Sequence, residues 1–466
     1  MEGSQMTEHA RNLPGVLEPE GVWRNVFDYH PLDVEIVRAE GVYLFDPDGN
    51  KYMDATGGPM AVNVGHGDKR IADAINAQMQ NYAYCHPYMA SRIRADFCNA
   101  IAEHTPGDLG PTYLVSGGSE AVETAIKIAR QFHCLTGNEG KHKIVGLYGS
   151  YHGMTLGTMA LSGSPAYNKY FDPMMPRWPH IPQYTDVGRP ADVDRDEWGR
   201  RCAEELAHIL HYEGAGTVAA FIATPVGVGS DYGLFAPDSY WQTIRQICDD
   251  NNVLLIADEV VTGFGRTGKW FAMEHFGVVP DLMVMGKGIA SSNMPLGGVT
   301  VSERINTPFK DGARFLHGFT NQGHPLACAA GLAVLDVLER DKLIDNARIR
   351  GAQVSNNRDR LVAHPTVANL TGRGLLMVME LVESKETGAY FDGERDAEHL
   401  FQSVALTHGL VFYSSLYGSR RGAVARGLPM WISPPLTITE SELDDLLDRL
   451  DATLTEWESL LGVNQA

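Results

Sequence analysis

Two residues of opposite charge end apolar segments of this chain, where a charge is expensive to bury. Asp258 follows VLLIA at 253–257, and Lys287, between two glycines, follows LMVMG at 282–286. Alone, the aspartate has an ordinary interpretation as a turn residue and the lysine as a solvated surface residue. Together they are expected to face each other across a small cleft, because buried charges need partners. An amine and a carboxylate in such a place can act in nucleophilic and proton-transfer steps.

Two further segments could bind the phosphate and the ring of a ligand. SGGSEA at 116–121 follows TYLV and leads into a helix, so Gly118 and Ser119 can form a phosphate cradle. The alternative is a simple helix N-cap after a glycine turn. Tyr151 and His152 follow KIVGLY, where an aromatic ring can stack on a planar ligand. The alternative is a core tyrosine beside a hydrogen-bonded histidine.

A phosphate cradle, a stacking ring, a buried acid and a buried amine together match pyridoxal 5′-phosphate. The aldehyde of this cofactor needs a lysine to form a Schiff base, and its pyridine nitrogen needs an acid that keeps it protonated. The four features therefore predict a pyridoxal-phosphate site.

Other motifs give weaker evidence of function. GFGRTG at 263–268 fits the dinucleotide pattern G-x-G-x-x-G, but residues 258–262 separate it from the preceding apolar run, and no acid ends a following strand at the required distance. We interpret it as a structural loop. No G-x-S-x-G elbow supports a serine hydrolase. His208 and His211 lie three residues apart without a third ligand and are interpreted as polar-face residues.

Alternating strands and helices must position these residues. Five continuous apolar runs suit strands buried on both faces of a parallel sheet, and residues 119–130 have the spacing of an amphipathic helix. This is the pattern of an α/β fold. The five runs are 112–116, 143–148, 218–223, 253–257 and 282–286.

Both ends of the chain are expected to build a second, smaller α+β lobe. GVYLFDPDGNKYMDAT predicts two short strands around a turn, and 374–381 and 410–414 predict two more. A closing helix follows Thr439, which forms a capping box with Glu442, and its leucine stripe is interpreted as facing the core. We divide the chain into an N-terminal segment (1–72), a large cofactor-binding domain (73–335) and a C-terminal small domain (336–466).

Composition narrows the class of protein. The 466 residues carry a formal charge of −20, which disfavours nucleic acid or an anionic membrane as a partner. Six scattered cysteines without a C-x-x-C pair suggest reduced thiols. The polar start, MEGSQMTEHAR, is unlike a targeting peptide, and no apolar run reaches membrane-spanning length. We therefore expect a cytoplasmic protein without a membrane segment.

Four stretches resemble the class III (omega) aminotransferases, with the likeness extending over roughly residues 30–460. They are SGGSEAVETAIKIAR, YHG, ADEVVTGFGRTGKWFAMEHFGVVPDLMVMGKG and FTNQGHPLACAAGLAVL. The resemblance implies fold type I of the pyridoxal-phosphate enzymes and a homodimer, possibly a tetramer, with active sites at its interface. The fold has a large domain around a mainly parallel sheet and a smaller α+β domain formed by both termini.

The same resemblance assigns roles to residues of this chain. Lys287 would be the Schiff-base lysine and Asp258 the partner of the pyridinium nitrogen. Tyr151, in the YHG motif with His152, would stack on one face of the ring, and Val260 would pack on the other. Gly118 and Ser119 would hold the phosphate, and Thr320 would reach the phosphate of the neighbouring subunit.

The expected reaction is a transamination in two halves, in which Lys287 moves a proton and a keto acid collects the amino group. Three other activities known on this fold, those of an aminomutase, a racemase and a decarboxylating enzyme, stay open, because a fold does not set the reaction. A binder without activity is disfavoured by the intact Lys287 and Asp258.

The substrate is expected to be an amine without an α-carboxylate, with pyruvate as acceptor. Thr224 stands before Pro225 where relatives usually carry a glutamate that shields an arginine. A small keto acid needs one bidentate arginine. Met60, in the apolar GGPMAV, lies at the expected substrate entrance. The candidates for the carboxylate-binding arginine are Arg420, Arg421 and Arg426.

Overall fold

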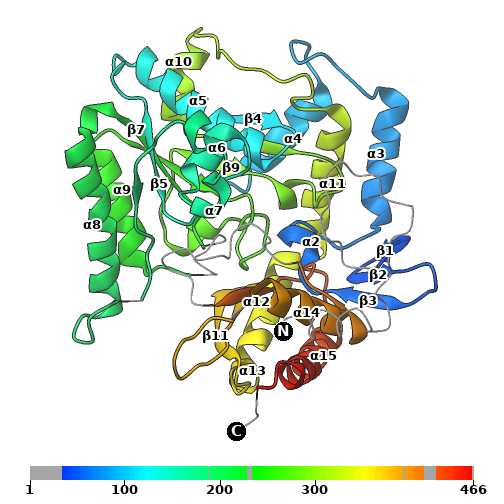
Figure 1. The fold of residues 1–466 in the computed structure, drawn as a ribbon. Coiled ribbons are helices and arrows are strands. Elements are labelled where there is room, and N and C mark those ends of the chain that lie inside the picture. The colour runs from blue at the N-terminus through cyan, green and yellow to red at the C-terminus, as the bar shows by residue number, and fades with distance from the viewer. Residues whose placement is uncertain (1–33, 187, 228–233, 392–393, 414–426, 464–466) are drawn as a thin grey trace.

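The computed structural model of the protein describes residues 34–186, 188–227, 234–391, 394–413 and 427–463. A seven-stranded sheet forms the centre of the large domain, in the upper half of Figure 1. Strand β10 runs antiparallel to both of its neighbours, and the pairs from β9 to β6 are parallel. In spatial order the strands are β4 (Thr112–Val115), β10 (Gly297–Val301), β9 (Leu282–Met285), β8 (Leu254–Asp258), β7 (Val218–Ala223), β5 (Lys143–Leu147) and β6 (His180–Ile181).

Helices cover both faces of this sheet. On one face α5 (Gly118–Leu135) packs on Ala220 and Ile222 of β7. On the other face α8 (Arg195–Glu213) and α9 (Asp238–Asp250) pack on Phe221 and Ala223 of the same strand. Every residue of β7, β8 and β9 is therefore buried, which explains why these runs do not alternate. The five predicted strands and the predicted helix are confirmed.

The remaining helices of the large domain flank the sheet. The long helix α11 (Pro325–Arg340) packs against α3 (Lys69–Asn81) and α4 (Arg92–Ala102). The shorter ones are α2 (Gly57–Met60), α6 (Leu156–Leu161), α7 (Pro165–Asn168) and α10 (Glu303–Lys310). Helix α2 is in fact a turn, since Gly58 and Pro59 have non-helical backbone angles.

Both ends of the chain contribute to the small domain, as expected from the sequence. Its four-stranded sheet joins β1 (Arg38–Glu40), β2 (Tyr43–Phe45) and β3 (Lys51–Asp54) to β13 (Leu410–Val411), which pairs with β3 in parallel. An antiparallel sheet of β11 (Val367–Arg373), β12 (Leu376–Leu381) and β14 (Leu428–Ile432) lies beside it. The helices are α12 (Leu343–Asn356), α13 (Arg358–Val362), α14 (Glu394–Thr407) and α15 (Glu440–Leu460). The domain boundaries set from the sequence stay a prediction.

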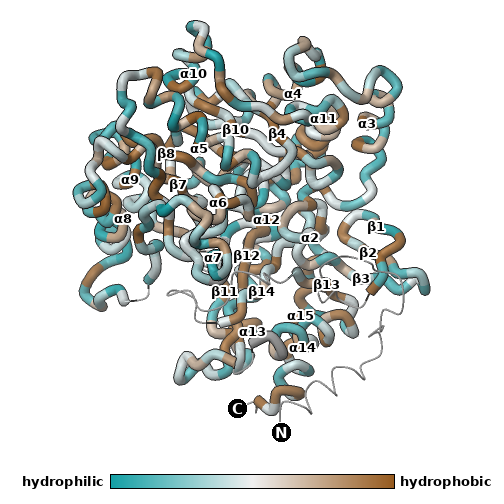
Figure 2. Tube along the Cα trace, turned by 45° about the horizontal axis from the view of Figure 1, so that its top comes forward, coloured by the Kyte–Doolittle hydropathy of each residue, from teal (hydrophilic) through white to brown (hydrophobic). Residues whose placement is uncertain are grey.

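The closing helix α15 begins and packs as predicted. The Glu442 N–H donates to the Thr439 hydroxyl at 3.3 Å, and the Thr439 N–H donates to the Glu442 carboxylate at 2.9 Å. Its leucines at 443, 446, 447, 450 and 454 are all buried. Figure 2 shows hydrophobic stretches running through the interior strands and hydrophilic ones in outer turns.

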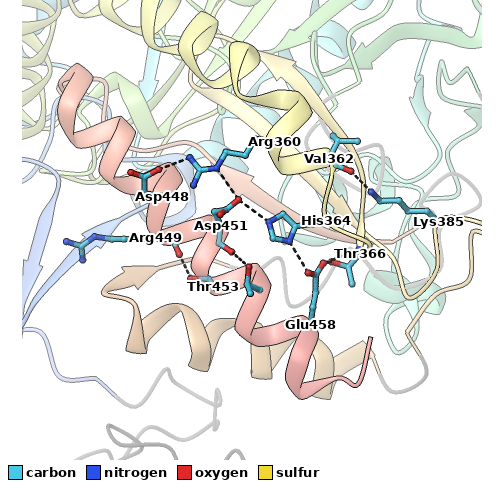
Figure 3. Close-up of polar contacts among 11 residues, drawn as sticks. Arg360, Val362, His364, Thr366, Lys385, Asp448, Arg449, Asp451, Thr453 and Glu458 are labelled. Carbon is cyan, nitrogen blue, oxygen red and sulfur yellow. Dashed lines mark hydrogen bonds and ion pairs between the residues drawn. The ribbon is translucent and has the colours of Figure 1, made fainter. Parts of the chain in front are cut away.

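A polar network ties α15 to β11 and α13 within this apolar surrounding (Figure 3). His364 contacts Glu458 through Nδ1 at 2.9 Å and Asp451 through Nε2 at 3.1 Å. Arg360 donates to Asp451 at 3.1 Å. The Thr366 hydroxyl donates to Glu458 at 2.6 Å. Since Glu458 is fully buried, its contacts with His364 and Thr366 compensate for the loss of water around its carboxylate.

Candidate active site

The carboxyl ends of four strands carry the residues that the sequence singled out. Gly118 and Ser119 begin α5 after β4, Tyr151 and His152 follow β5, Asp258 ends β8, and Lys287 follows β9. Ligands bind at this edge in open parallel sheets.

The loops meet closely around Val260. A Cβ placed on Gly118 would lie 3.0 Å from Val260 Cγ1, and one on Gly286 would lie 3.1 Å from the same atom. The Gly286 Cβ would also lie 3.4 Å from the Cα of Gly118. The loops after β4, β8 and β9 therefore form one contiguous surface.

The Asp258 carboxylate is buried and oriented by two contacts. Its Oδ2 accepts from His152 Nδ1 at 2.7 Å, and its Oδ1 accepts from the Val260 N–H at 3.1 Å. The His152 side chain is fully buried, and its Nε2 has no partner among the described residues. A carboxylate held in this way can keep one fixed direction toward a ligand atom.

Lys287 has the properties of a reactive amine. Its backbone is left-handed, with φ +45°, and its Nζ donates to the Pro59 carbonyl oxygen at 2.7 Å. Although part of the residue is exposed to solvent, desolvation lowers the pKa of the amine to about 8. The negative charge of Asp258 opposes this shift, and the positive charge of Arg266 adds to it. A larger share of the amine is thus neutral near pH 7 than for an ordinary lysine.

The Lys287 amine contacts a strained turn at residues 57–60. Gly57, Gly58 and Met60 all have positive φ, and the Gly58 N–H donates to the Asp54 carboxylate at 3.0 Å. The Met60 side chain is 6% exposed and packs in an apolar cluster with Trp431 and others. Its predicted contact with substrate stays a prediction.

The start of α5 fits a phosphate group. Gly117 precedes the helix in an extended conformation without a side-chain cap, so the positive helix end is open to an anion. The Ser119 hydroxyl accepts from the Met154 N–H at 3.3 Å. Gly153 has φ +124°, and a Cβ there would lie 2.4 Å from Ser119 Oγ, so only glycine fits.

This donor set fits pyridoxal 5′-phosphate. The helix start suits the phosphate, the buried Asp258 suits a protonated ring nitrogen, and the Lys287 amine with its lowered pKa suits an aldehyde. The described residues contain no group of three potential metal ligands, and the helix α8 histidines His208 and His211 lie on its exposed side.

Tyr151 lies between the ring site and the end of β13. Its ring packs edge-on against Tyr167 at 5.6 Å. Burial raises the pKa of its hydroxyl, and the negative charges of Tyr413 and Asp258 add to this. It therefore remains protonated at neutral pH. Stacking on a cofactor remains a prediction for Tyr151, as packing does for Val260.

Among the described residues, neither the predicted phosphate contact of Thr320 nor the predicted carboxylate-binding arginine is part of this cluster. Thr320 is exposed on the loop before α11, and its carbonyl accepts from the Tyr84 hydroxyl at 3.1 Å. The candidate arginines Arg420, Arg421 and Arg426 lie outside the described residues.

Sequence reasoning missed three groups around the site. The Pro59 carbonyl could not be found from the sequence, because a backbone group has no side-chain signal. Arg266 had a signal, since it lies inside the GFGRTG motif. Glu259, directly after Asp258, is fully buried and accepts from the backbone N–H groups of Ala272 at 3.0 Å and Met273 at 2.8 Å. Burial raises the pKa of Glu259 to about 7. It anchors the loop that follows β8.

Comparisons with known proteins agree on one family. The family model described as aminotransferase class-III matches residues 26–454. The probable aminotransferase Rv3329 of Mycobacterium tuberculosis is 36% identical over 92% of this chain and 90% of its own length. The putrescine–pyruvate aminotransferase of Pseudomonas aeruginosa is 35% identical over 90% of this chain and 91% of its own. The crystal structure of an (S)-enantioselective omega-transaminase from Thermomicrobium roseum superposes with a TM-score of 0.85, at 33% identity, over 98% of this chain and 99% of that one.

Proposed function

The chain belongs to the class III aminotransferases, a pyridoxal-phosphate-dependent family of fold type I, and we propose that it moves the amino group of an amine without an α-carboxylate to pyruvate. The observation that carries the transfer chemistry is the pair at the ends of β8 and β9, a buried Asp258 and a Lys287 whose amine has a pKa of about 8. Primary amines and omega-amino acids form the donor class.

The bound cofactor supplies an electron sink for the carbon that loses its proton. In the proposal Lys287 Nζ takes that proton and returns it to the cofactor, which an amine with a pKa near neutrality can do in both directions. The Asp258 carboxylate, fixed by His152, holds a proton on the ring nitrogen. Gly118 and Ser119 bind the phosphate at the start of α5.

Two features of the chain support the substrate class. The turn at 57–60 carries no charged side chain, and Met60 in it belongs to an apolar cluster. Thr224, directly after β7, stands before Pro225, where the resemblance to the family implies a glutamate. One arginine, Arg421 or Arg426 in the proposal, would then bind the single carboxylate of pyruvate. The relative from Pseudomonas aeruginosa is named for putrescine and pyruvate.

Parallel initial-rate measurements with putrescine as donor test the acceptor. Alanine formed from pyruvate and glutamate formed from 2-oxoglutarate are compared at equal acceptor concentrations. We expect kcat/KM to be several-fold higher with pyruvate, because a dicarboxylate needs a second cation in the pocket. Faster glutamate formation would contradict the acceptor and leave the aminotransferase assignment intact. Formation of neither amino acid would contradict transfer from putrescine itself.

The proposal includes a homodimer with shared active sites. Thr320 is exposed, and the loops around it and around residue 84 present large exposed apolar side chains, as an interface does. These side chains are Tyr84, Tyr88, Met89 and Leu316.

We also propose that the protein is cytoplasmic. All six cysteines are free thiols, which agrees with a reducing cytoplasm. Among the described residues no helix is long and apolar enough to cross a membrane.

A further inference from the structure

The GFGRTG loop is the place where the small domain docks on the large one. Gly265 and Gly268 have φ values of +89° and +82°. A Cβ on Gly265 would lie 2.9 Å from Ile344, and one on Gly268 would lie 3.0 Å from Arg348, both on α12. A Cβ on Gly374, just before β12, would lie 2.5 Å from the backbone of the loop. The glycines thus allow backbone-to-backbone packing between domains.

Arg266 in the centre of this loop is a buried cation held by neutral oxygens. Its Nη1 donates to the carbonyl oxygens of Pro434 at 2.6 Å, Ser433 at 2.9 Å and Leu375 at 3.2 Å. Its Nη2 donates to the Asn63 side-chain oxygen at 3.0 Å. The side chain is fully buried, and none of these partners is a carboxylate. The positive charge is therefore solvated by dipoles without being neutralised by contact.

The arginine also joins the elements that receive Lys287. A Cβ on Gly57, in the strained turn, would lie 3.6 Å from Arg266 Nη2. The Asn63 amide that accepts from Arg266 donates to the Phe264 carbonyl oxygen at 2.8 Å. A Cβ on Gly288, directly after the lysine, would lie 2.5 Å from the same amide nitrogen. One side chain thus links the end of β14, the turn before Met60 and the lysine loop.

We propose that Arg266 is a positioning residue for Lys287: it fastens the end of β14 to the turn that receives the lysine, and its unneutralised charge favours the uncharged amine. The proposal rests on the proposed function only in making Lys287 the group that takes the proton. Neither the donor nor the acceptor enters it.

The electrostatics agree with this geometry. Burial lowers the pKa of Lys287 to about 8, and the Arg266 charge acts in the same direction. Burial also lowers the pKa of Arg266 itself to about 9, with Asp54 opposing the shift. The other titratable groups around the pair are His152 and Tyr151, both next to Asp258, together with Tyr413 beside Tyr151 and His66 beside Asp54.

Competitive labelling of the cofactor-free full-length protein with trace acetic anhydride tests the charge. The reagent acylates only the neutral amine, so the pH dependence of Lys287 labelling, read by mass spectrometry of its peptide, reports the pKa of this amine. For the unmodified protein we expect a midpoint at about 8. A midpoint at the ordinary value of 10.5 would overturn the proposal.

Three variants separate charge from packing. Arg266→Gln removes the charge and should slow Lys287 labelling at pH 7 by at least about threefold, equivalent to half a pKa unit. Arg266→Lys keeps a basic group, but burial lowers the pKa of a lysine there too, so its labelling should lie between those of Arg266→Gln and the unmodified protein. Lys141→Gln is the matched control, because Lys141 is another buried cation held by three backbone carbonyls, those of Ala215, Val218 and Asn251. Lys141 lies at the opposite edge of the sheet, so its substitution should not change the labelling of Lys287.

Hydrogen exchange of the same variants tests whether Arg266 fastens the end of β14 to the turn that receives Lys287. Both Arg266 variants should exchange the amides of 428–435 and of the turn at 57–61 faster than Lys141→Gln does, since a lysine cannot reproduce four bonds of the guanidinium. Unchanged labelling in Arg266→Gln, or unchanged exchange in both Arg266 variants, overturns the proposal. If Arg266→Gln does not fold, Arg266→Lys decides: faster exchange of these amides supports the proposal, and unchanged exchange overturns it.

Discussion

Lys287 and Asp258 have opposite environments although both end buried strands. The amine has one neutral hydrogen-bond acceptor, the Pro59 carbonyl, and burial favours its uncharged form. The carboxylate accepts a bond from His152 Nδ1 and another from the Val260 N–H, and these fix its orientation. The two groups are therefore suited to opposite tasks, proton transfer at Lys287 and stabilisation of a positive ring nitrogen at Asp258.

Asp258→Asn is expected to lower kcat by at least about 100-fold, a loss of roughly 3 kcal/mol of transition-state stabilisation. An amide cannot hold a ring proton by charge, although it can keep the contact with His152. Steady-state kinetics with saturating cofactor measure the effect, and a circular dichroism spectrum checks the fold. Near-normal turnover in this variant would remove Asp258 from the mechanism.

At the scale of elements, the loop after β8 connects the chemistry to the small domain. Glu259 anchors one part of it through the backbone of the segment at 272–273, and Arg266 anchors another through the end of β14. Both are buried charged residues without a charged contact partner among the described residues. The segment between Asp258 and β9 is thus held at several points, which keeps the edge of the active site rigid.

Gly374→Ala should destabilise the protein by about 1–3 kcal/mol, because its Cβ would clash with the loop backbone and its φ is positive. The φ is +58°, and the Cβ would lie 2.5 Å from the carbonyl carbon of Thr267. Gly388→Ala is the control, with φ +66° and open space around its Cβ, so it reports the backbone strain alone. Urea unfolding measures both variants. Equal losses in the two would argue against close docking at Gly374.

The network at His364 should make stability depend on pH. Burial opposes protonation of His364, but bonds to Glu458 and Asp451 raise its pKa above 6.5 overall. Burial likewise disfavours the Glu458 charge, yet bonds from His364 and Thr366 lower its pKa below 4.5. The histidine contribution is complete below pH 6.5 and is lost as the pH rises through its folded pKa, whereas that of the glutamate is lost as the pH falls through its own.

His364→Gln should therefore destabilise the protein more at about pH 5.5 than at about pH 9. Urea unfolding of both proteins at the two pH values measures this difference. His408→Gln serves as the control, since His408 is a more exposed histidine that contacts Glu456 on the same helix. An equal effect of His364→Gln at both pH values would mean that folding leaves the pKa of His364 unchanged and would contradict the prediction.

At the scale of the whole molecule, the proposed homodimer would place Thr320 at the phosphate site of a second copy. Thr320 lies on an exposed loop that Tyr84 holds, and Arg94 donates to Gly323 at the end of the same loop at 3.1 Å. The loop is therefore held at two points. A partner subunit would complete the phosphate contacts.

Mixing Lys287→Ala with a Thr320→Val variant tests this arrangement. Each hybrid dimer should contain one native site, so a 1:1 mixture after subunit exchange should recover about a quarter of the unmodified activity. The separate proteins should show far less, provided that the Thr320 hydroxyl is needed for cofactor binding. No recovery after verified exchange, or a Thr320 contact to the phosphate of its own subunit in a crystal structure, would contradict the shared site.

The sequence by itself determined the α/β fold and the strand positions, and it predicted Asp258 and Lys287 as the two central residues of the site. Continuous apolar runs can only be buried on both faces, and a charge that ends such a run must be paired or functional. The buried leucines and the capping box of α15 followed from local periodicity in the same way. The predicted strand at 410–414 is confirmed only as β13, Leu410–Val411, because pairing with β3 sets its length.

Only the tertiary structure decided which distant groups complete the site. The contact between Lys287 and Pro59 joins residues 228 positions apart in the sequence, and a carbonyl oxygen has no signature in a sequence. GFGRTG fits a dinucleotide pattern, yet its glycines serve domain packing and its arginine holds β14. Local spacing specifies a backbone conformation, whereas the partner of that backbone depends on how the chain folds back on itself.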